Sequence, residues 1–146
     1  MDNPHIADNT DTRERLKALV TRLSDADLLR PLGEGWTVAA TFAHIAFWDR
    51  RVLRLLEKWE REGVRPSPLP ADVDAINDAA QALCLAILPR AAAQLMVDTA
   101  EALDRKIEQV APELAAAIQA AGGHVSFKRW HHRREHLEQL EQMFGG

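Results

Sequence analysis

The stretch TVAATFAHIAFWDRRVLRLLEKWERE, residues 37–62, decides the fold class of this protein. Thr37 is a good helix N-cap, because its hydroxyl can accept a hydrogen bond from a free backbone N–H of the first turn. Apolar residues then recur at helical spacing and define one face: Phe42, Ile45, Trp48, Val52, Leu55, Leu56 and Trp59. Basic residues lie outside this face: Arg50, Arg54, Lys58 and Arg61. The pattern predicts one long amphipathic helix that ends near Glu62.

The residues before this stretch predict another helix and a loop. The helix begins near Asp11 or Thr12 and carries an apolar stripe made of Leu16, Leu19, Val20 and Leu23. Residues 24–27 can cap a short turn, and a loop follows at Pro31, Gly33 and Gly35. No alternation of apolar and polar residues is long enough to predict a β-strand.

The residues after this stretch predict a linker and further helices. Residues 63–70 contain a glycine and three prolines and form a stiff linker. A helix follows over 72–89, where Pro89 ends or kinks it, and another runs over 89–110. Pro112 fits the first turn of a short helix that ends at the Gly pair of 122–123, and the last helix runs over 126–144.

Four principal helices and one linker long enough for a crossover predict an all-α fold, a four-helix bundle with a crossover connection. The length of 146 residues fits a single domain, 1–146. A hydrophobic content of 47% is enough to build a core, which excludes wholesale disorder.

Charge and composition exclude several classes of function. The formal net charge is -4, which argues against a general nucleic-acid binder, because such a protein needs an excess of cations. No uncharged segment is long enough to cross a bilayer, and the first residues lack the apolar core of a secretory signal. The single cysteine, Cys84, lies in an apolar segment, so we expect it to be buried packing rather than a nucleophile. Together these features predict a cytoplasmic protein without membrane or nucleic-acid partners.

Three of the six histidines have placements that suit metal ligands. His132 and His136 stand at i and i+4 in the last helix and share one flank, so both rings can converge on one ion. His44 lies at the border of the apolar face of the helix over 37–62. If the two helices are neighbours, three imidazoles meet at the rim of the core. Three protein ligands with open positions are typical of a working divalent-metal site.

The other three histidines predict no site. His131 falls on the polar side of the last helix, and His5 and His124 lie in a tail and a Gly-rich turn, so we expect all three on the surface. A His-x3-His pair is by itself more often incidental than a metal site.

Several segments resemble motifs of DinB/YfiT-like proteins. Residues 35–45, GWTVAATFAHI, resemble the G-W-T-v-x-x-x-x-x-H-l opening of their second helix. His132-x3-His136, with the Leu and Gln residues that follow, resembles their closing helix. Residues 23–36 and 73–77 also fit. The resemblance covers nearly the whole chain, and the order and spacing of the motifs together are specific.

This resemblance implies a four-helix bundle with a crossover, often homodimeric, that holds a divalent metal such as zinc or nickel. Carried over to this sequence, the ligands are His44, His132 and His136. Characterised relatives include S-transferases that depend on the thiols bacillithiol or mycothiol, and a thiol-dependent isomerase. In such chemistry the metal binds the cofactor thiol and lowers its pKa, so that the thiolate attacks an electrophile.

Charged residues near the predicted ligands have several interpretations. Arg51 projects on the His44 side at i+7 and could clamp a carboxylate of an anionic thiol cofactor. Asp49 and Glu135 are candidate partners for histidine N–H groups. The remaining arginines near the site predict a solvated charged face rather than an electropositive rim: Arg50, Arg54, Arg133 and Arg134.

Three functions are open at the level of sequence. The first is a metal-dependent thiol S-transferase that acts on a small-molecule electrophile. The second is a non-catalytic metal-binding stress-response protein of the same fold, since no general base, nucleophile or second motif is evident. The third is a helical interaction module with coincidental histidines, which predicts that His44→Ala leaves the metal content unchanged.

Overall fold

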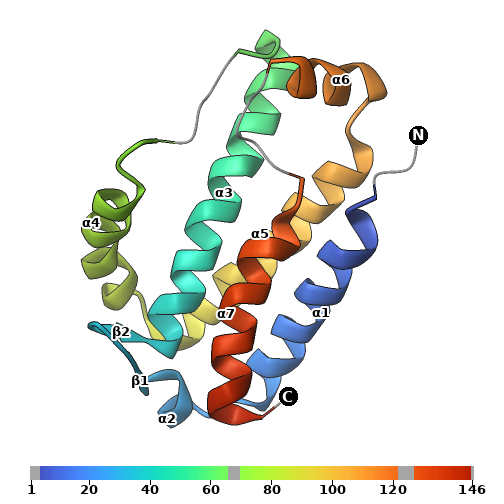
Figure 1. Ribbon diagram of the computed structural model, residues 1–146. Coiled ribbons are helices and arrows are strands. Elements are labelled where there is room, and N and C mark those ends of the chain that lie inside the picture. Colours follow the sequence, from blue (N-terminus) through green and yellow to red (C-terminus); the bar gives the residue numbers. More distant parts are fainter. Residues whose placement is uncertain (1–3, 66–69, 122–126, 146) are drawn as a thin grey trace.

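The computed structural model describes residues 4–65, 70–121 and 127–145. Four helices form a bundle in which α1 contacts α5 and α7, and α3 contacts the same two helices (Figure 1). Their bounds are Ile6–Arg22 (α1), Val38–Glu62 (α3), Pro89–Gln109 (α5) and Arg129–Phe144 (α7). The predicted all-α fold is confirmed.

The connection between α3 and α5 is a crossover. Helix α4, Val73–Ala86, runs along the outside of the bundle from the end of α3 towards the start of α5, so α3 and α5 point in the same direction (Figure 1). Helix α6, Pro112–Ala120, lies across one end of the bundle. None of the helices in the described ranges has an apolar stretch long enough to span a membrane.

The long helix α3 has the boundaries that its sequence predicts. Oγ1 of Thr37 accepts a hydrogen bond from the backbone N–H of Ala40 at 3.1 Å, which caps the first turn. The helix ends at Gly63, whose φ of 85° is easily reached only without a Cβ.

Helices α1 and α7 begin elsewhere than predicted. Helix α1 begins at Ile6 rather than near Asp11 or Thr12, because Asn9 is buried inside it and contacts the start of α7. The Asn9 side chain donates to the carbonyl of Phe127 at 2.8 Å and accepts from the N–H of Trp130 at 2.9 Å. Helix α7 begins at Arg129. The predicted starting point, residue 126, and the Gly pair at 122–123 lie outside the described residues.

The segment between α1 and α3 contains elements that the sequence did not predict as strands. Ser24 caps helix α2, Asp25–Leu28, through a capping box with Asp27, as expected for the predicted short turn. Strands β1, Pro31–Gly33, and β2, Trp36–Thr37, then form a short antiparallel pair. The turn between them has positive φ at Gly33, Glu34 and Gly35, and this backbone bend sets the pairing.

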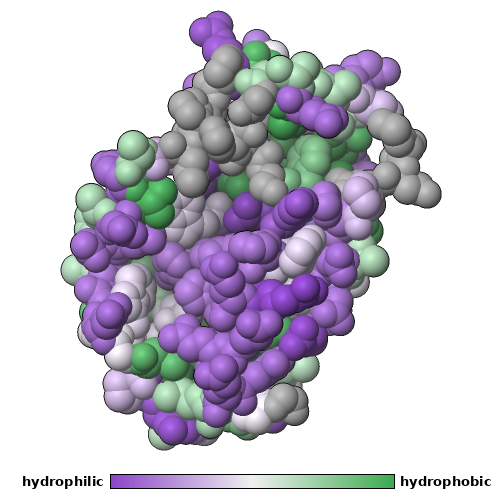
Figure 2. All heavy atoms as spheres, in the orientation of Figure 1, coloured by the Kyte–Doolittle hydropathy of each residue, from purple (hydrophilic) through white to green (hydrophobic). Residues whose placement is uncertain are grey.

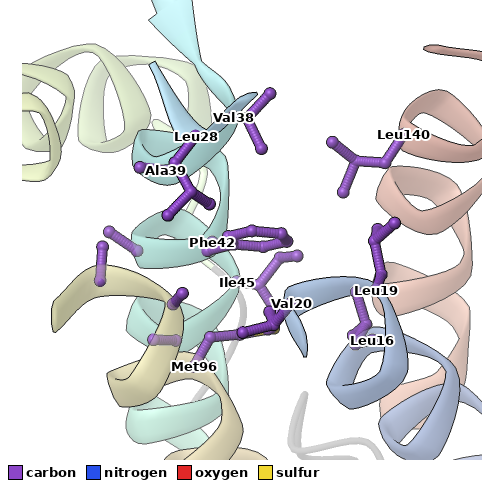
Figure 3. Close-up of a cluster of buried hydrophobic side chains, with 14 of the residues drawn as sticks. Leu16, Leu19, Val20, Leu28, Val38, Ala39, Phe42, Ile45, Met96 and Leu140 are labelled. Atoms are coloured by element: carbon purple, nitrogen blue, oxygen red, sulfur yellow. The ribbon is translucent and has the colours of Figure 1, made fainter. Parts of the chain in front are cut away.

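The core has two apolar clusters along the bundle axis. Figure 3 shows the first, where Phe42 and Ile45 of α3 face side chains of α1, α5 and α7. The second surrounds Trp59 near the other end of α3. The outer face of the molecule over α7 is hydrophilic (Figure 2).

Helix α4 is an outer layer that contributes few residues to the core. Among its residues only Cys84 is buried, and burial raises the pKa of the Cys84 thiol, so the thiol stays protonated at neutral pH. The prediction of a packed cysteine is confirmed. Leu83, although apolar, is 71% exposed.

Candidate metal centre

The rings of His44, His132 and His136 meet between α3 and α7. Nε2 of His132 lies 3.1 Å from Nε2 of His44 and 3.2 Å from Nε2 of His136. One ring nitrogen from each residue can be chosen so that all three lie within 4.8 Å of one another. The structure therefore brings together the three residues that helical projection put at the rim of the core, and this cluster could hold a metal ion.

The spacing of these nitrogens fits a cation. Three nitrogens bound to one ion at about 2.1 Å, with angles of about 90 to 110°, lie about 3.0 to 3.4 Å apart. Both short Nε2 separations, 3.1 and 3.2 Å, fall in that range. Without a cation, a single hydrogen on Nε2 of His132 could serve only one of its two contacts, because a neutral imidazole carries one N–H. A cation accepts all three lone pairs at once, so the donor set fits a divalent metal ion.

Burial keeps the rings neutral. It lowers the pKa of His44 to about 4, with repulsion from His136 as the second cause. Burial also lowers the pKa of His132 to about 3, assisted by repulsion from the two other rings. The pKa of His136 is lowered by burial as well, although its contact with Gln139 opposes the shift. Neutral rings leave their lone pairs free at neutral pH, which metal binding requires.

Gln139 orients one of the rings. Its Oε1 lies 3.4 Å from Nδ1 of His136. Because an amide oxygen only accepts, Nδ1–H of His136 is the donor, and the lone pair is left on Nε2, which faces the other rings. Nδ1 of His132 is buried and has no hydrogen-bond partner within the described ranges. No role was predicted for Gln139 beyond its place in the family motif.

A buried ion network lies behind the histidines and joins α7 to α3 and α5. The Arg133 side chain is fully buried and donates from Nε to Asp49 at 3.0 Å and from Nη1 and Nη2 to Asp104 at 3.0 and 2.8 Å. Nε of Arg129 donates to the other oxygen of Asp49 at 2.9 Å. Burial raises the pKa of the Asp49 carboxyl. The positive charges and hydrogen bonds of Arg133 and Arg129 lower it by more, so the pKa is below its ordinary value. Since Arg133 follows His132 directly, the network fixes the position of α7 at the histidines.

The structure shows the surroundings of three charged residues that were considered near the predicted ligands. Arg133 is not part of a solvated face, because two carboxylates neutralise it inside the bundle. Within the described ranges, the hydrogen bonds that Asp49 accepts come from Arg129 and Arg133 and not from a histidine N–H. Glu135 is exposed, its Oε1 lies 3.7 Å from Nδ1 of His131, and its charge opposes the lowering of the pKa of His136.

A cavity of about 710 Å³ opens beside the histidines. Its walls come from the β1–β2 segment, α3, α4 and α7, and both His44 and His136 face it. His132 is not among its described lining residues, so the third ring lies behind the other two. Trp36 also lines the cavity, and its ring meets that of His44 edge-on with 5.5 Å between centroids.

Arg51 is not brought to this cavity by any contact within the described ranges. It is half-buried, and burial, followed by repulsion from Arg129, lowers the pKa of its guanidinium. Its role as a carboxylate clamp stays a prediction. His5 is half-buried rather than a free surface residue, since its Nδ1 accepts from Nε1 of Trp130 at 3.5 Å. His124 lies outside the described residues.

The family model described as the DinB superfamily matches residues 9–140. The match extends from α1 into α7 and includes all three clustered histidines. It confirms the resemblance seen in the sequence motifs. No curated protein and no solved structure matches the chain.

Proposed function

The chain belongs to the DinB superfamily, and from this membership and the three converging imidazoles we propose that it is a metal-dependent thiol S-transferase. Its cosubstrate would be a low-molecular-weight thiol of the bacillithiol or mycothiol type, and its second substrate a small electrophile. The observation that carries the proposal is the short separation of the Nε2 atoms of the three rings, at 3.1 and 3.2 Å.

His44, His132 and His136 would hold the metal, with zinc or nickel as the first choices. A divalent cation bound there would lower the pKa of a thiol ligand and so supply a thiolate at neutral pH. The protein contributes neutral rings, because burial lowers the pKa of each. Gln139 contributes orientation by accepting from Nδ1–H of His136.

The cavity supports substrate access to this cluster. Its volume of about 710 Å³ lies within the range of roughly 300–1,000 Å³ that is usual for small-molecule sites. Two of the three rings face it, and three protein ligands leave further coordination positions for a thiol or water.

The second candidate is a non-catalytic metal-binding protein of the same fold. It is favoured by the lining of the cavity, since no Cys, Ser, Lys or Arg side chain is among the described lining residues. The one lining hydroxyl, that of Thr41, already donates to the carbonyl of Thr37 at 3.0 Å. Under this alternative the protein binds a metal without turnover.

A conjugation assay distinguishes the two candidates. Zinc- or nickel-loaded protein is incubated with bacillithiol or mycothiol and monochlorobimane, and the fluorescent conjugate is followed. We expect turnover by the wild type and by His131→Ala, whose side chain is exposed, and none by His44→Ala. Full metal loading without thiol binding or conjugation would favour the non-catalytic protein. The homodimer expected from the resemblance is a separate proposal, which light scattering of the purified protein tests.

A further inference from the structure

We propose that Asn9, in α1, is a positioning residue of the metal centre, because it holds α7 on both sides of His132. This inference rests on the proposed function, since the ring that Asn9 places is one of the three proposed metal ligands. It adds a residue from a helix that supplies none of those ligands.

His132 is the ring whose direction depends most on its backbone. Its Nε2 contacts Nε2 of both other rings, at 3.1 and 3.2 Å. Histidines that bind a metal usually donate their other ring N–H to an acceptor, which fixes the ring. His136 has such an acceptor in Gln139, whereas Nδ1 of His132 is buried without a hydrogen-bond partner in the described residues. The position of the His132 ring therefore follows from the position of the α7 backbone.

Asn9 contacts α7 and the residue that leads into it at three points. Its Nδ2 donates to the carbonyl oxygen of Phe127 at 2.8 Å, and its Oδ1 accepts from the backbone N–H of Trp130 at 2.9 Å. Its backbone carbonyl accepts from Nη1 of Arg133 at 3.2 Å. Trp130 precedes His132 by two residues and Arg133 follows it directly, so these contacts lie on both sides of the histidine.

Helix α7 has no side-chain cap of its own. The residue at its N-cap position, Lys128, makes no capping hydrogen bond with its side chain. The start of a helix leaves backbone N–H groups without a partner inside the helix, and Oδ1 of Asn9 accepts from one of them, that of Trp130. Asn9 therefore caps α7 from the neighbouring helix α1 (Figure 1). The ion network joins α7 to α3 and α5, and Asn9 joins α7 to α1.

The Asn9 amide can make both side-chain hydrogen bonds in only one register of the two helices. Asn9 is 1% exposed, so an unpaired Nδ2 or Oδ1 would find no water to replace the lost bond. A slip of one residue along a helix moves a side chain by about 1.5 Å and turns it by about 100°. A functional site tolerates errors of only about 0.5 Å in its side chains. Loss of this register would therefore separate His132 from His44.

Asn9→Ala tests the inference, with Thr12→Ala as the matched control. Thr12 is as buried as Asn9 and lies one turn further along α1. Within the described ranges, its hydroxyl donates to carbonyls of its own helix, those of Asp8 and Asn9, so its removal breaks no bond to α7. The free energy of unfolding in urea is measured for both variants. Asn9→Ser is the second variant if Asn9→Ala does not fold, because its hydroxyl is too short to bridge the two original partners.

The first readout needs no metal. In the metal-free wild type, the ring centroids of His44 and His132 lie 5.0 Å apart, which should give a nuclear Overhauser effect between their carbon-bound ring protons. We expect this effect to disappear in Asn9→Ala. It should persist in Thr12→Ala, even if the two variants lose the same amount of stability.

The second readout is the binding of cobalt, followed by its absorption spectrum and by competition with a chelator. We expect the cobalt affinity of Asn9→Ala to fall by about tenfold or more, as for other residues that orient metal ligands. The spectrum should change as well, because it reports the ligand set and geometry. Thr12→Ala should keep both properties. Asn9→Asp should retain most of the affinity, since a carboxyl oxygen can still accept from the N–H of Trp130.

The two readouts separate this inference from the proposed function. If the wild type binds no cobalt, but the ring contact is lost in Asn9→Ala and kept in Thr12→Ala, the proposed metal centre is wrong and the positioning role stands. If the ring contact is absent from the wild type, survives in Asn9→Ala or is lost equally in Thr12→Ala, the positioning role is wrong, whatever the cobalt affinity. An Asn9→Asp variant as weak as Asn9→Ala would also overturn it, because the contact with Trp130 would then not place the ring.

Discussion

Nε of Arg133 in α7 donates to Oδ2 of Asp49 in α3 at 3.0 Å, and Arg133 directly follows the histidine at the centre of the metal-ligand cluster. Asp49 lies between the two apolar clusters of the core, where α3 has no other charged residue facing inward. A pair of charges inside an apolar bundle can form in only one register, because any shift would leave a buried charge unpaired. The pair therefore aligns α7 with α3 and brings His132 to His44.

Asp49→Asn should destabilise the metal-free protein strongly. Removing one partner of a buried ion pair typically costs about 3–5 kcal/mol, since the other charge remains buried without compensation. Here both Arg129 and Arg133 lose a charged acceptor. The free energy of unfolding in urea measures the loss. The control, Asp25→Asn, removes an exposed partner of Arg90 and should have a much smaller effect. Equal changes in the two variants would contradict a stabilising role for the buried network.

His44→Ala should abolish stoichiometric metal binding. Only two clustered rings would remain. The metal affinity should therefore fall by more than the roughly 10–100-fold that is lost when a hydrogen-bond partner of a metal ligand is removed. Elemental analysis after zinc loading and gel filtration measures the content. His131→Ala is the matched control, because His131 is in α7 beside the cluster but exposed. Unchanged metal in the His44 variant would instead support an interaction module with coincidental histidines.

Stability of the metal-free protein should fall as the pH drops from about 6.5 towards 4. In the unfolded chain the histidines take up protons near their ordinary pKa, whereas burial lowers the pKa of His44 to about 4 and of His132 to about 3 in the folded protein. The unfolded state therefore binds more protons in this window, and acid favours unfolding. Above the window the rings are neutral in both states, and their contribution no longer changes.

Urea denaturation with a chelator present, repeated across this pH range, measures the slope. His44→Gln removes one of the titrating groups and should make the slope shallower, whereas His131→Gln should leave it unchanged. A slope that does not respond to the His44 substitution would show that other groups cause the acid sensitivity.

Gln139→Ala should weaken metal affinity by about tenfold, because such partners fix the tautomer of a ligand. The amide oxygen of Gln139 accepts from Nδ1–H of His136, and without it this ring can turn or place its hydrogen on Nε2. Competition with a chromophoric chelator measures the affinity. Gln139→Glu keeps an acceptor and should retain binding, and Gln142→Ala, at an exposed position of the same helix, is the control. Loss in all three variants would indicate a general effect on α7.

The positions of the histidines could be predicted because side-chain direction on a helix follows from spacing. His132 and His136 are four residues apart in the sequence, and His44 lies at the edge of a well-defined apolar face. That α3 and α7 are neighbours is a property of packing, which no local pattern contains. The long helix α3 was also predictable, since its cap and its terminating glycine are local signals.

The buried charges had a sequence signal that was misinterpreted. Arg133 stands three residues after Trp130 and four before Leu137, in the middle of the apolar stripe of α7. Asp49 occupies the equivalent place in the stripe of α3. Opposite charges at core positions of two helices predict a buried pair, although the choice of partner depends on tertiary packing. The β1–β2 pair was not predictable in the same way, because it depends on three consecutive positive φ angles at 33–35.

Because of the crossover, the residues of the histidine cluster are far apart in the sequence. His44 and His132 are 88 positions apart, and α4, α5 and α6 lie between them in the sequence. During synthesis, His44 leaves the ribosome long before its two partners exist, so no half-made chain can present the full set of rings. Any ion held by all three rings would be acquired only after α7 has docked on α3.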